Sequence, residues 1–296
     1  LDKKYFSHVS VQYAGLHSLL PENKNVKYIS IFHAANDPNY KIKVFNNFNI
    51  NFKEILKKLY LKYYLYNYSK ANKVICVSNA SKITAKNSFG VPIEKIEINR
   101  YGLIDYSNHD LINFKNEFKI KENTKVIFCA GRETIDKGVL DFCEIAKSLF
   151  NLNWRFIFLG GYNDKDFHNT IVNKYGKYVT FAGMRKDIMS FYKYADLFLF
   201  LSHRESAGQV LMESFNFGLP VVTWDIFGVN EIVRNGYNGY MCKFNDFEDV
   251  KNKVKLLLNN KNLYDKISEN CKTSFYKNYT IDTSAENLLK IFTRTN

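Results

Sequence analysis

Residues 197–224 read LFLFLSHRESAGQVLMESFNFGLPVVTW and predict a strand, a polar loop, a helix and a second strand in immediate succession. Residues 197–201 are continuously apolar, which is typical of a strand buried on both faces of a parallel sheet. Gly208 closes the polar loop and opens the helix, and Gly218 stops that helix just before the apolar run 221–223. This succession indicates an α/β fold with a parallel sheet.

The same alternation of apolar runs and helical segments extends through the chain. A polar stretch at residues 106–123 separates two series, and we expect it to connect two domains and to contain a helix of its own. A Lys- and Tyr-rich helix is expected at residues 52–69, and one helix is expected between each pair of strands in the second series. The predicted strands are 26–32 and 73–77 in the first series and 126–130, 155–159, 179–181, 197–201 and 221–223 in the second.

These two series predict two Rossmann-like, doubly wound α/β domains with a boundary near residue 105. A length of 296 residues suits two domains, and 46% hydrophobic residues supply ordinary cores. Residues 1–105 contain fewer strands than a doubly wound domain commonly has, and the chain starts at Leu1. We therefore expect the N-terminal domain to be incomplete.

Cysteine usage and hydropathy indicate a cytoplasmic protein. The five cysteines are an odd number without a C-x-x-C pair, and Cys76 and Cys129 lie in apolar runs, as buried reduced thiols do. No run of 18 apolar residues and no basic region followed by an apolar core is visible, so neither a membrane span nor a signal peptide is predicted.

The net charge of +13 lies mostly in residues 1–105. A basic surplus of this kind suits nucleic acid, an anionic membrane surface or a phosphorylated substrate, and composition alone does not choose among them. The choice depends on the motifs, which favour a phosphorylated substrate over nucleic acid.

Two carboxylates flank the start of the helix at 208. Glu205 precedes this helix and Glu213 lies in its second turn, while Ser206 and Ala207 are small enough to let a ligand approach the backbone. A helix N-terminus suits the diphosphate of a nucleotide-sugar, and carboxylates accept hydrogen bonds from hydroxyls, which assigns the sugar to Glu205 and the ribose to Glu213. The alternative is that Glu205 caps the helix while Glu213 faces solvent. The turn at Gly218 favours the ligand site, because it places Glu205 and Glu213 at the carboxyl ends of the strands, where open α/β sheets bind ligands in a crevice.

This stretch resembles glycosyltransferase family 4, the retaining glycosyltransferases with two facing Rossmann-like domains (GT-B type). The family pattern consists of a Glu, a short run of small residues that includes a Gly, and a second Glu eight positions after the first. The residues that match are Glu205, Gly208, Glu213, Gly228, Glu231, Gly236 and Gly239. The resemblance implies a site for a UDP- or GDP-linked sugar. The donor-binding residues it implies are Gly131, Met184, Ser206, Ala207, Gly208, Gln209, Val210 and Glu213.

A second loop follows the predicted strand 126–130. Residues 131–138 read GRETIDKG and resemble the family's Gly-Arg then Lys-Gly loop, which implies that Arg132 and Lys137 hold the donor phosphates. Two cations at a strand end stabilise the negative charge that grows on a departing diphosphate. Without the resemblance, Arg and Lys in such a loop would be read as solvated charges.

Weaker matches extend the resemblance over most of the chain. Met184 follows a strand as the family's base-contacting turn does, and His33 follows another as the family's sugar-side His does. A single His is otherwise more often a packed or solvent-facing residue. Ser206 and Ala207 stand where many members have Gly and Phe, and no N-terminal Gly-rich loop is present.

No metal or organic cofactor is predicted, and the nucleotide-sugar is a substrate. Asp164 and Asp166 form an Asp-x-Asp that could hold a divalent cation, but their polar turn predicts solvated carboxylates. The cysteines and histidines show no zinc spacing, and neither a G-x-G-x-x-G nor a Walker loop occurs.

The segment 52–68, FKEILKKLYLKYYLYNY, combines lysines with tyrosines. Such a helix can lie on anionic lipid, so we expect the protein to associate peripherally with the inner face of the membrane. The alternative is a helix on the domain surface that buries its Ile and Leu side.

The resemblance implies a retaining, metal-independent hexosyl transfer to a glycan or lipid-linked acceptor in surface polysaccharide or lipopolysaccharide biosynthesis. The catalytic residues it implies are Arg132, Lys137, Glu205 and His33. Domains are expected at residues 1–105 on the acceptor side and 106–275 on the donor side, with a helix at 276–296 crossing back. The alternatives are a nucleotide-sugar epimerase or phosphorylase, and a non-catalytic adaptor for a membrane or nucleic acid.

Overall fold

The computed structural model describes residues 9–13, 27–32, 71–150 and 152–294. The chain forms two compact units: residues 1–101 with 284–296 make up one, and residues 102–283 make up the other. The predicted helix at 52–69 and the predicted site residue His33 lie outside the described residues. The assignment of acceptor and donor roles to domains stays a prediction.

In the first unit a parallel sheet is ordered β1-β2-β3-β4. The predicted strands 26–32 and 73–77 are confirmed as β2 and β3, whereas β1 and β4 were not predicted. The strands are β1 Val9–Tyr13, β2 Lys27–Phe32, β3 Lys73–Cys76 and β4 Ile96–Ile98. The helices are α2 Asn79–Phe89, the short 3₁₀ helix Ile93–Lys95, and α9 Ile281–Thr293, which this unit includes from Ser284 onward.

Sequence explains how these helices are placed. Ser78 caps α2, because its hydroxyl accepts from the Ser81 backbone N–H at 2.9 Å while the Ser81 hydroxyl bonds back to the Ser78 N–H. The second half of α9 brings Ile291 against Ile75 of the sheet region, with Leu288 and Phe292 packed beside them. The chain's last helix therefore belongs to the core of its first unit.

The described part of the second unit contains a parallel sheet ordered β10-β9-β8-β5-β6-β7. If β5 to β10 are numbered 1 to 6, the order from β7 to β10 is 3-2-1-4-5-6, which is the Rossmann order. The topological switch point lies between β5 and β8. The strands are β5 Lys125–Ala130, β6 Trp154–Leu159, β7 Val179–Gly183, β8 Leu197–Phe200, β9 Val221–Trp224 and β10 Gly239–Cys242. The five predicted strands are confirmed, and β10 was not predicted.

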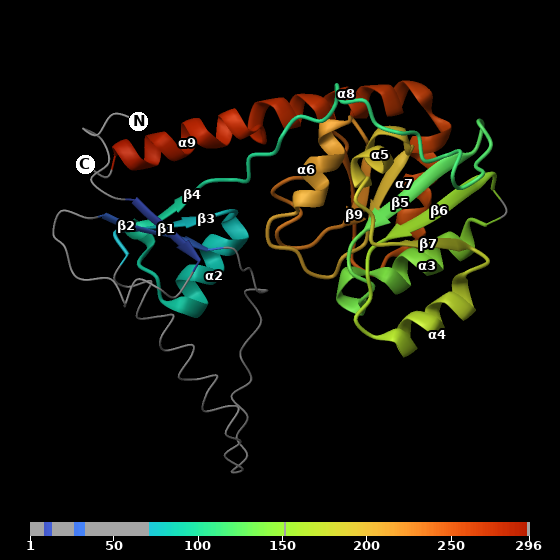
Figure 1. Ribbon diagram of the computed structural model, residues 1–296, viewed down its shortest axis with the longest axis horizontal. Coiled ribbons are helices and arrows are strands. Elements are labelled where there is room, and N and C mark those ends of the chain that lie inside the picture. The colour runs from blue at the N-terminus through green and yellow to red at the C-terminus, as the bar shows by residue number, and fades with distance from the viewer. Residues whose placement is uncertain (1–8, 14–26, 33–70, 151, 295–296) are drawn as a thin grey trace, which may run out of the picture. The chain divides into compact units, whose positions relative to one another are not determined.

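Helices cover both faces of this sheet, which is why β8 and β9 are buried along their whole length. Figure 1 shows α3 and α4 on one side of the sheet and α6 and α8 on the other. The helices are α3 Val139–Ser148, α4 Lys165–Tyr175, α5 Ile188–Tyr194, α6 Gln209–Asn216, α7 Phe247–Asn259 and α8 Lys261–Asn278. A helix between each pair of the predicted strands is confirmed.

The helix predicted within residues 106–123 is wrong. This stretch forms turns, and its longest run of turn ends at Lys119, which has a φ of 51°. A left-handed residue stops helix propagation, and the Ile120 N–H closes the turn on the Lys115 carbonyl at 2.9 Å. Buried Phe114 stacks on Phe191 with ring centroids 4.1 Å apart, so the stretch is held on the second unit by side-chain packing.

Candidate functional site

The loops that follow β5 and β8 meet at the switch point of the second sheet. The backbone N–H of His203 donates to the Asp136 carbonyl at 2.9 Å, and the Ser202 hydroxyl donates to the same oxygen at 3.2 Å. Adjacent parallel strands end at the same edge, so two loops distant in sequence are placed side by side. This edge holds most of the predicted site residues.

Gly138 allows the two loops to approach closely. It has a φ of 71°, and a Cβ built on it would lie 1.9 Å from the Leu201 carbonyl oxygen. The 3₁₀ helix Ile135–Lys137 ends at this glycine and α3 begins immediately after it. The glycine thus combines a left-handed turn with a backbone contact that no side chain permits.

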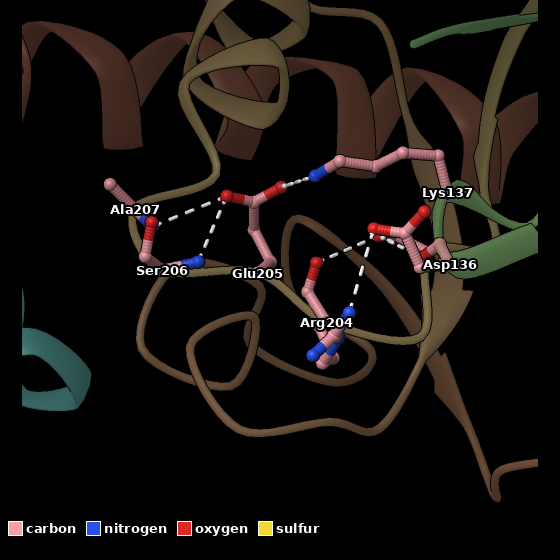
Figure 2. A network of polar contacts seen from close by, with 7 residues as sticks. Asp136, Lys137, Arg204, Glu205, Ser206 and Ala207 are labelled. Carbon is pink, nitrogen blue, oxygen red and sulfur yellow. Dashed lines mark hydrogen bonds and ion pairs between the residues drawn. The ribbon is translucent and has the colours of Figure 1, made fainter. Parts of the chain in front are cut away.

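Lys137 and Glu205 form an ion pair between these loops. The Lys137 Nζ lies 3.1 Å from Oε2 of Glu205, and their side chains are only 23% and 14% exposed. The other oxygen of Glu205 accepts from the backbone N–H groups of Ser206 at 2.9 Å and Ala207 at 3.4 Å. Figure 2 shows Lys137 extending from its loop to the carboxylate.

The charge of Glu205 is stabilised by its surroundings. Burial raises the pKa of this carboxyl, but Lys137 and the backbone N–H groups of Ser206 and Gly208 outweigh burial and hold the pKa below its usual range. The interpretation of Glu205 as a helix cap does not describe these contacts, because the N–H groups of Ser206 and Ala207 precede α6 and the start of α6 at Gly208 has no side-chain cap. The role of Glu205 toward a sugar stays a prediction, compatible with the carboxylate's remaining lone pairs.

Glu213 lies in α6 and is not a solvent-facing carboxylate, so that alternative is wrong. The phenol of Tyr192, a buried residue of α5, donates to Glu213 Oε2 at 2.9 Å. Burial raises the pKa of Glu213, and the hydrogen bond from Tyr192 only partly offsets it. A half-buried carboxylate of this kind gains from a ligand that donates hydrogen bonds to it.

The other predicted residues that the structure describes lie in loops at the carboxyl ends of β5, β7 and β8 or in the first turn of α6. Arg132 is exposed. A second arginine near this edge, Arg204, places its Nη2 3.9 Å from Oδ2 of Asp136. Met184, after β7, is 86% exposed. Gly208 adopts a φ of 54° and precedes the first residue of α6. The remaining predicted residues are Gly131 and Ser206, half-buried, Ala207, buried, Gln209, exposed, and Val210, half-buried.

This geometry agrees with the family that the chain matches. The family model described as glycosyl transferases group 1 matches residues 112–274, which contain both loops and α6. The chain belongs to this family. The two loops and α6 of this group 1 glycosyl transferase therefore lie within the matched region.

Relatives of known name resemble the chain over part of their length. N-acetyl-alpha-D-glucosaminyl L-malate synthase of Bacillus anthracis is 26% identical over 188 residues, 60% of this chain and 49% of the relative. The capsular polysaccharide biosynthesis glycosyltransferase CapM of Staphylococcus aureus is 26% identical over 209 residues, 69% of this chain and 51% of the relative. The chain thus spans about half the length of these two relatives.

A solved structure extends the likeness to most of the chain. Anabaena Alr3699/HepE, in complex with UDP and glucose, gives a TM-score of 0.75 over 91% of this chain and 72% of that chain, at 19% identity. A likeness at this identity concerns the fold alone. It confirms the GT-B fold class that the sequence predicted.

A contact between a buried carboxylate and a histidine, which the sequence did not reveal, involves the first loop of this group 1 glycosyl transferase. Glu133, 2% exposed, places Oε2 at 2.6 Å from Nδ1 of His168, and the His168 ring stacks on Tyr162 with centroids 4.0 Å apart. Oε1 of Glu133 makes no hydrogen bond to any residue in the described ranges. The two residues are 35 positions apart, so no spacing rule brings them together.

The predicted turn around Asp164 begins a helix. Asp164 caps α4 by accepting from the backbone N–H groups of Asp166 and Phe167, each at 3.0 Å, which leaves the Asp-x-Asp a capping role. Within the part of the chain that the structure describes, no group of three or more His, Cys, Asp or Glu side chains could hold a metal ion. In the same residues, no helix combines the length and apolar character needed to cross a bilayer.

Proposed function

We propose that this group 1 glycosyl transferase moves a hexosyl group from a UDP- or GDP-linked sugar to a glycan or lipid-linked acceptor in bacterial surface polysaccharide biosynthesis. The observation that carries the proposal is the Lys137–Glu205 pair at the switch point between β5 and β8. Ligands of open α/β sheets bind at this point. Here it presents a cation, a carboxylate and the start of a helix together.

The diphosphate occupies the space between Lys137, exposed Arg132 and the start of α6. An ammonium group has three N–H donors, so Lys137 can keep its bond to Glu205 while it binds a phosphate oxygen. As the sugar leaves, negative charge grows on the nucleoside diphosphate. The two cations stabilise this charge more strongly in the transition state than in the ground state, which is the condition for catalysis.

The two carboxylates orient the donor. Glu205 is held by Lys137 and the Ser206 and Ala207 backbone, so it can direct its free lone pairs to sugar hydroxyls without further ordering. Glu213, fixed by the Tyr192 phenol, accepts from the ribose hydroxyls. Donor hydroxyls also supply the hydrogen bonds that offset the burial of Glu213.

The transfer proceeds with retention at the anomeric carbon and without a metal ion, as the resemblance implies. Proton NMR of the first-formed product, together with assays in EDTA, tests both points. An inverted anomer overturns the first, and loss of activity that Mg²⁺ or Mn²⁺ restores overturns the second.

The acceptor is a glycan, and the transfer takes place at the inner face of the membrane. CapM, a relative named for capsular polysaccharide biosynthesis, supports a glycan acceptor. The excess of basic residues in 1–105 supports a location at the inner face of an anionic membrane. Flotation with phosphatidylglycerol vesicles tests this location. Binding that disappears after Lys57→Glu and Lys58→Glu substitutions supports it, and binding that is unchanged, or absent in the wild type, excludes it.

The nucleotide panel is the deciding experiment. Thermal shifts with UDP, GDP, ADP, UDP-glucose and GDP-mannose are measured on the wild type, on Glu213→Ala and on the control Glu269→Ala, an exposed residue of α8. The proposal expects one base to stabilise the wild type and the control but not Glu213→Ala. Absence of any shift favours the non-catalytic adaptor instead.

A further inference from the structure

The side chain of His203 ties the Glu205 loop to α3. Its Nε2 lies 2.9 Å from Oδ2 of Asp141, a residue in the first turn of α3. Asp141 is 14% and His203 28% exposed, so the bond is largely shielded from water. His203 is two residues before Glu205, and its contact lies on an element different from the one that carries Lys137.

Asp141 is itself held in place from the interior. The indole Nε1 of Trp224, a fully buried residue at the end of β9, donates to the same Oδ2 at 3.0 Å. Trp224 packs edge-on against Phe247 and Phe244, with ring centroids 5.4 and 5.8 Å apart, and the His203 ring also meets Phe244 edge-on at 5.1 Å. Asp141 is thus a rigid anchor for the His203 side chain.

The segment between the anchor and the carboxylate is short. The His203 backbone is fixed on the Asp136 carbonyl, and the Ser202 hydroxyl bonds to the Arg204 carbonyl at 2.9 Å. The Arg204 side chain is 59% exposed, and among the described residues its ion-pair contact is with Asp136 at 3.9 Å. The direction in which the chain leaves toward Glu205 therefore depends on where His203 is held.

We propose that Asp141 and His203 are positioning residues that fix Glu205 for the donor sugar, an inference that rests on the proposed function. Asp141 orients His203, and His203 sets the path of the backbone that carries Glu205 to Lys137. Because a carboxylate oxygen accepts, Nε2 of His203 is the donor of this bond to Asp141. Neither residue exchanges a proton with substrate.

The test separates positioning of the sugar from support of the fold. The probes are UDP for the diphosphate site and UDP-glucose, followed by release of UDP, for the sugar; GDP and GDP-mannose replace them if the wild type prefers guanine. His203→Ala is expected to lower kcat/KM for donor hydrolysis about 10- to 100-fold, since small misplacements of a reacting group cost this much. Nucleoside diphosphate affinity is expected to stay within about twofold.

Three variants make the result specific. His203→Gln keeps an N–H donor near the Nε2 position and restores hydrolysis to within about threefold of the wild type. Asp141→Asn, which keeps the shape and one acceptor oxygen, gives an intermediate loss and serves if His203→Ala does not fold. His109→Ala, an exposed histidine of the same unit, leaves hydrolysis and affinity unchanged.

A double-mutant cycle decides whether the effect passes through Glu205. In a Glu205→Gln background, His203→Ala is expected to add less than about a twofold further loss, since coupled residues are not additive. Unchanged hydrolysis in His203→Ala, a parallel fall in diphosphate affinity and Tm, or full multiplication of the two losses overturns the inference. If Glu205→Gln alone has no effect, it is the assigned role of Glu205 in the proposed function that fails.

Discussion

The Nζ of Lys137 lies 3.1 Å from Oε2 of Glu205, although the two residues are 68 positions apart in the chain. The pair joins the loop after β5 to the loop after β8, and both partners are largely shielded from water. Removing one partner of such a pair leaves the other largely buried without its counter-charge, so each single variant also affects its partner.

Glu205→Gln is expected to separate sugar turnover from nucleotide binding. The amide keeps the size of the side chain but loses the charge that accepts from sugar hydroxyls, so donor turnover falls about 10- to 100-fold. Affinity for the nucleoside diphosphate stays within about threefold, because Lys137 remains available to phosphate. Steady-state kinetics and calorimetric titration measure the two effects, and equal losses in both would contradict the assignment of Glu205 to the sugar.

Gly138→Ala is expected to disrupt the junction of the two loops. The new Cβ would lie 1.9 Å from the Leu201 carbonyl oxygen, which forces the backbone apart. Gly236→Ala is the matched control, because Gly236 has a similar φ of 73° but nothing within 4 Å of the added atom. We expect Gly236→Ala to lower the free energy of unfolding by about 1–2 kcal/mol, because its φ is left-handed. We expect Gly138→Ala to lower it by at least about 2 kcal/mol more. Equal urea midpoints for the two variants would show that the contact is dispensable.

Glu213→Gln is expected to stabilise the unliganded protein while it weakens nucleotide binding. Burial raises the folded-state pKa of Glu213, so its contribution to stability is present below the ordinary value of 4.5 and is lost as pH rises through the folded-state value. The gain in Tm of Glu213→Gln over the wild type should therefore grow as the pH rises above 4.5 and become constant once Glu213 is ionised in the folded protein. Glu269→Gln, at an exposed position, should show no such trend, and a gain that shrinks with pH would reverse the sign argued for Glu213.

The contact between Glu133 and His168 should contribute to stability, because Glu133 is buried. His168→Leu leaves the Glu133 carboxylate without its partner at 2.6 Å and is expected to cost about 2 kcal/mol or more in the free energy of unfolding. The double substitution Glu133→Leu with His168→Leu removes both polar groups and should recover most of this loss. Urea unfolding of the single and double variants gives the coupling, and a double variant less stable than His168→Leu would exclude this account.

Five strands of the second sheet were predictable because they are mostly apolar runs between polar loops. The three missed strands lack that signature. In the first sheet, polar Ser10 and Gln12 interrupt β1, and β4 is only three residues long and contains Glu97. In the second sheet, β10 begins with Gly239. The helix expected in 106–123 failed because a left-handed Lys119 and the packing of Phe114 override local propensity.

The site was predictable only in part. Glu205 and Lys137 could be placed at one edge, since both follow neighbouring strands of a parallel sheet. Their direct pairing, however, depends on the loops' path around Gly138. The contacts of Tyr192 with Glu213 and of Trp224 with Asp141 join separate elements, and no sequence period relates such residues.

The central claim is that the junction of the β5 and β8 loops binds a nucleoside diphosphate, and calorimetric titration of UDP and GDP into the wild type and Lys137→Gln tests it most directly. Lys147→Gln, at an exposed position of α3, is the control. The account predicts that the wild type and the control bind one nucleotide alike and that Lys137→Gln binds it at least about tenfold more weakly, for loss of a charge-assisted bond worth about 1.5–3 kcal/mol. Equal affinity in all three proteins would contradict it.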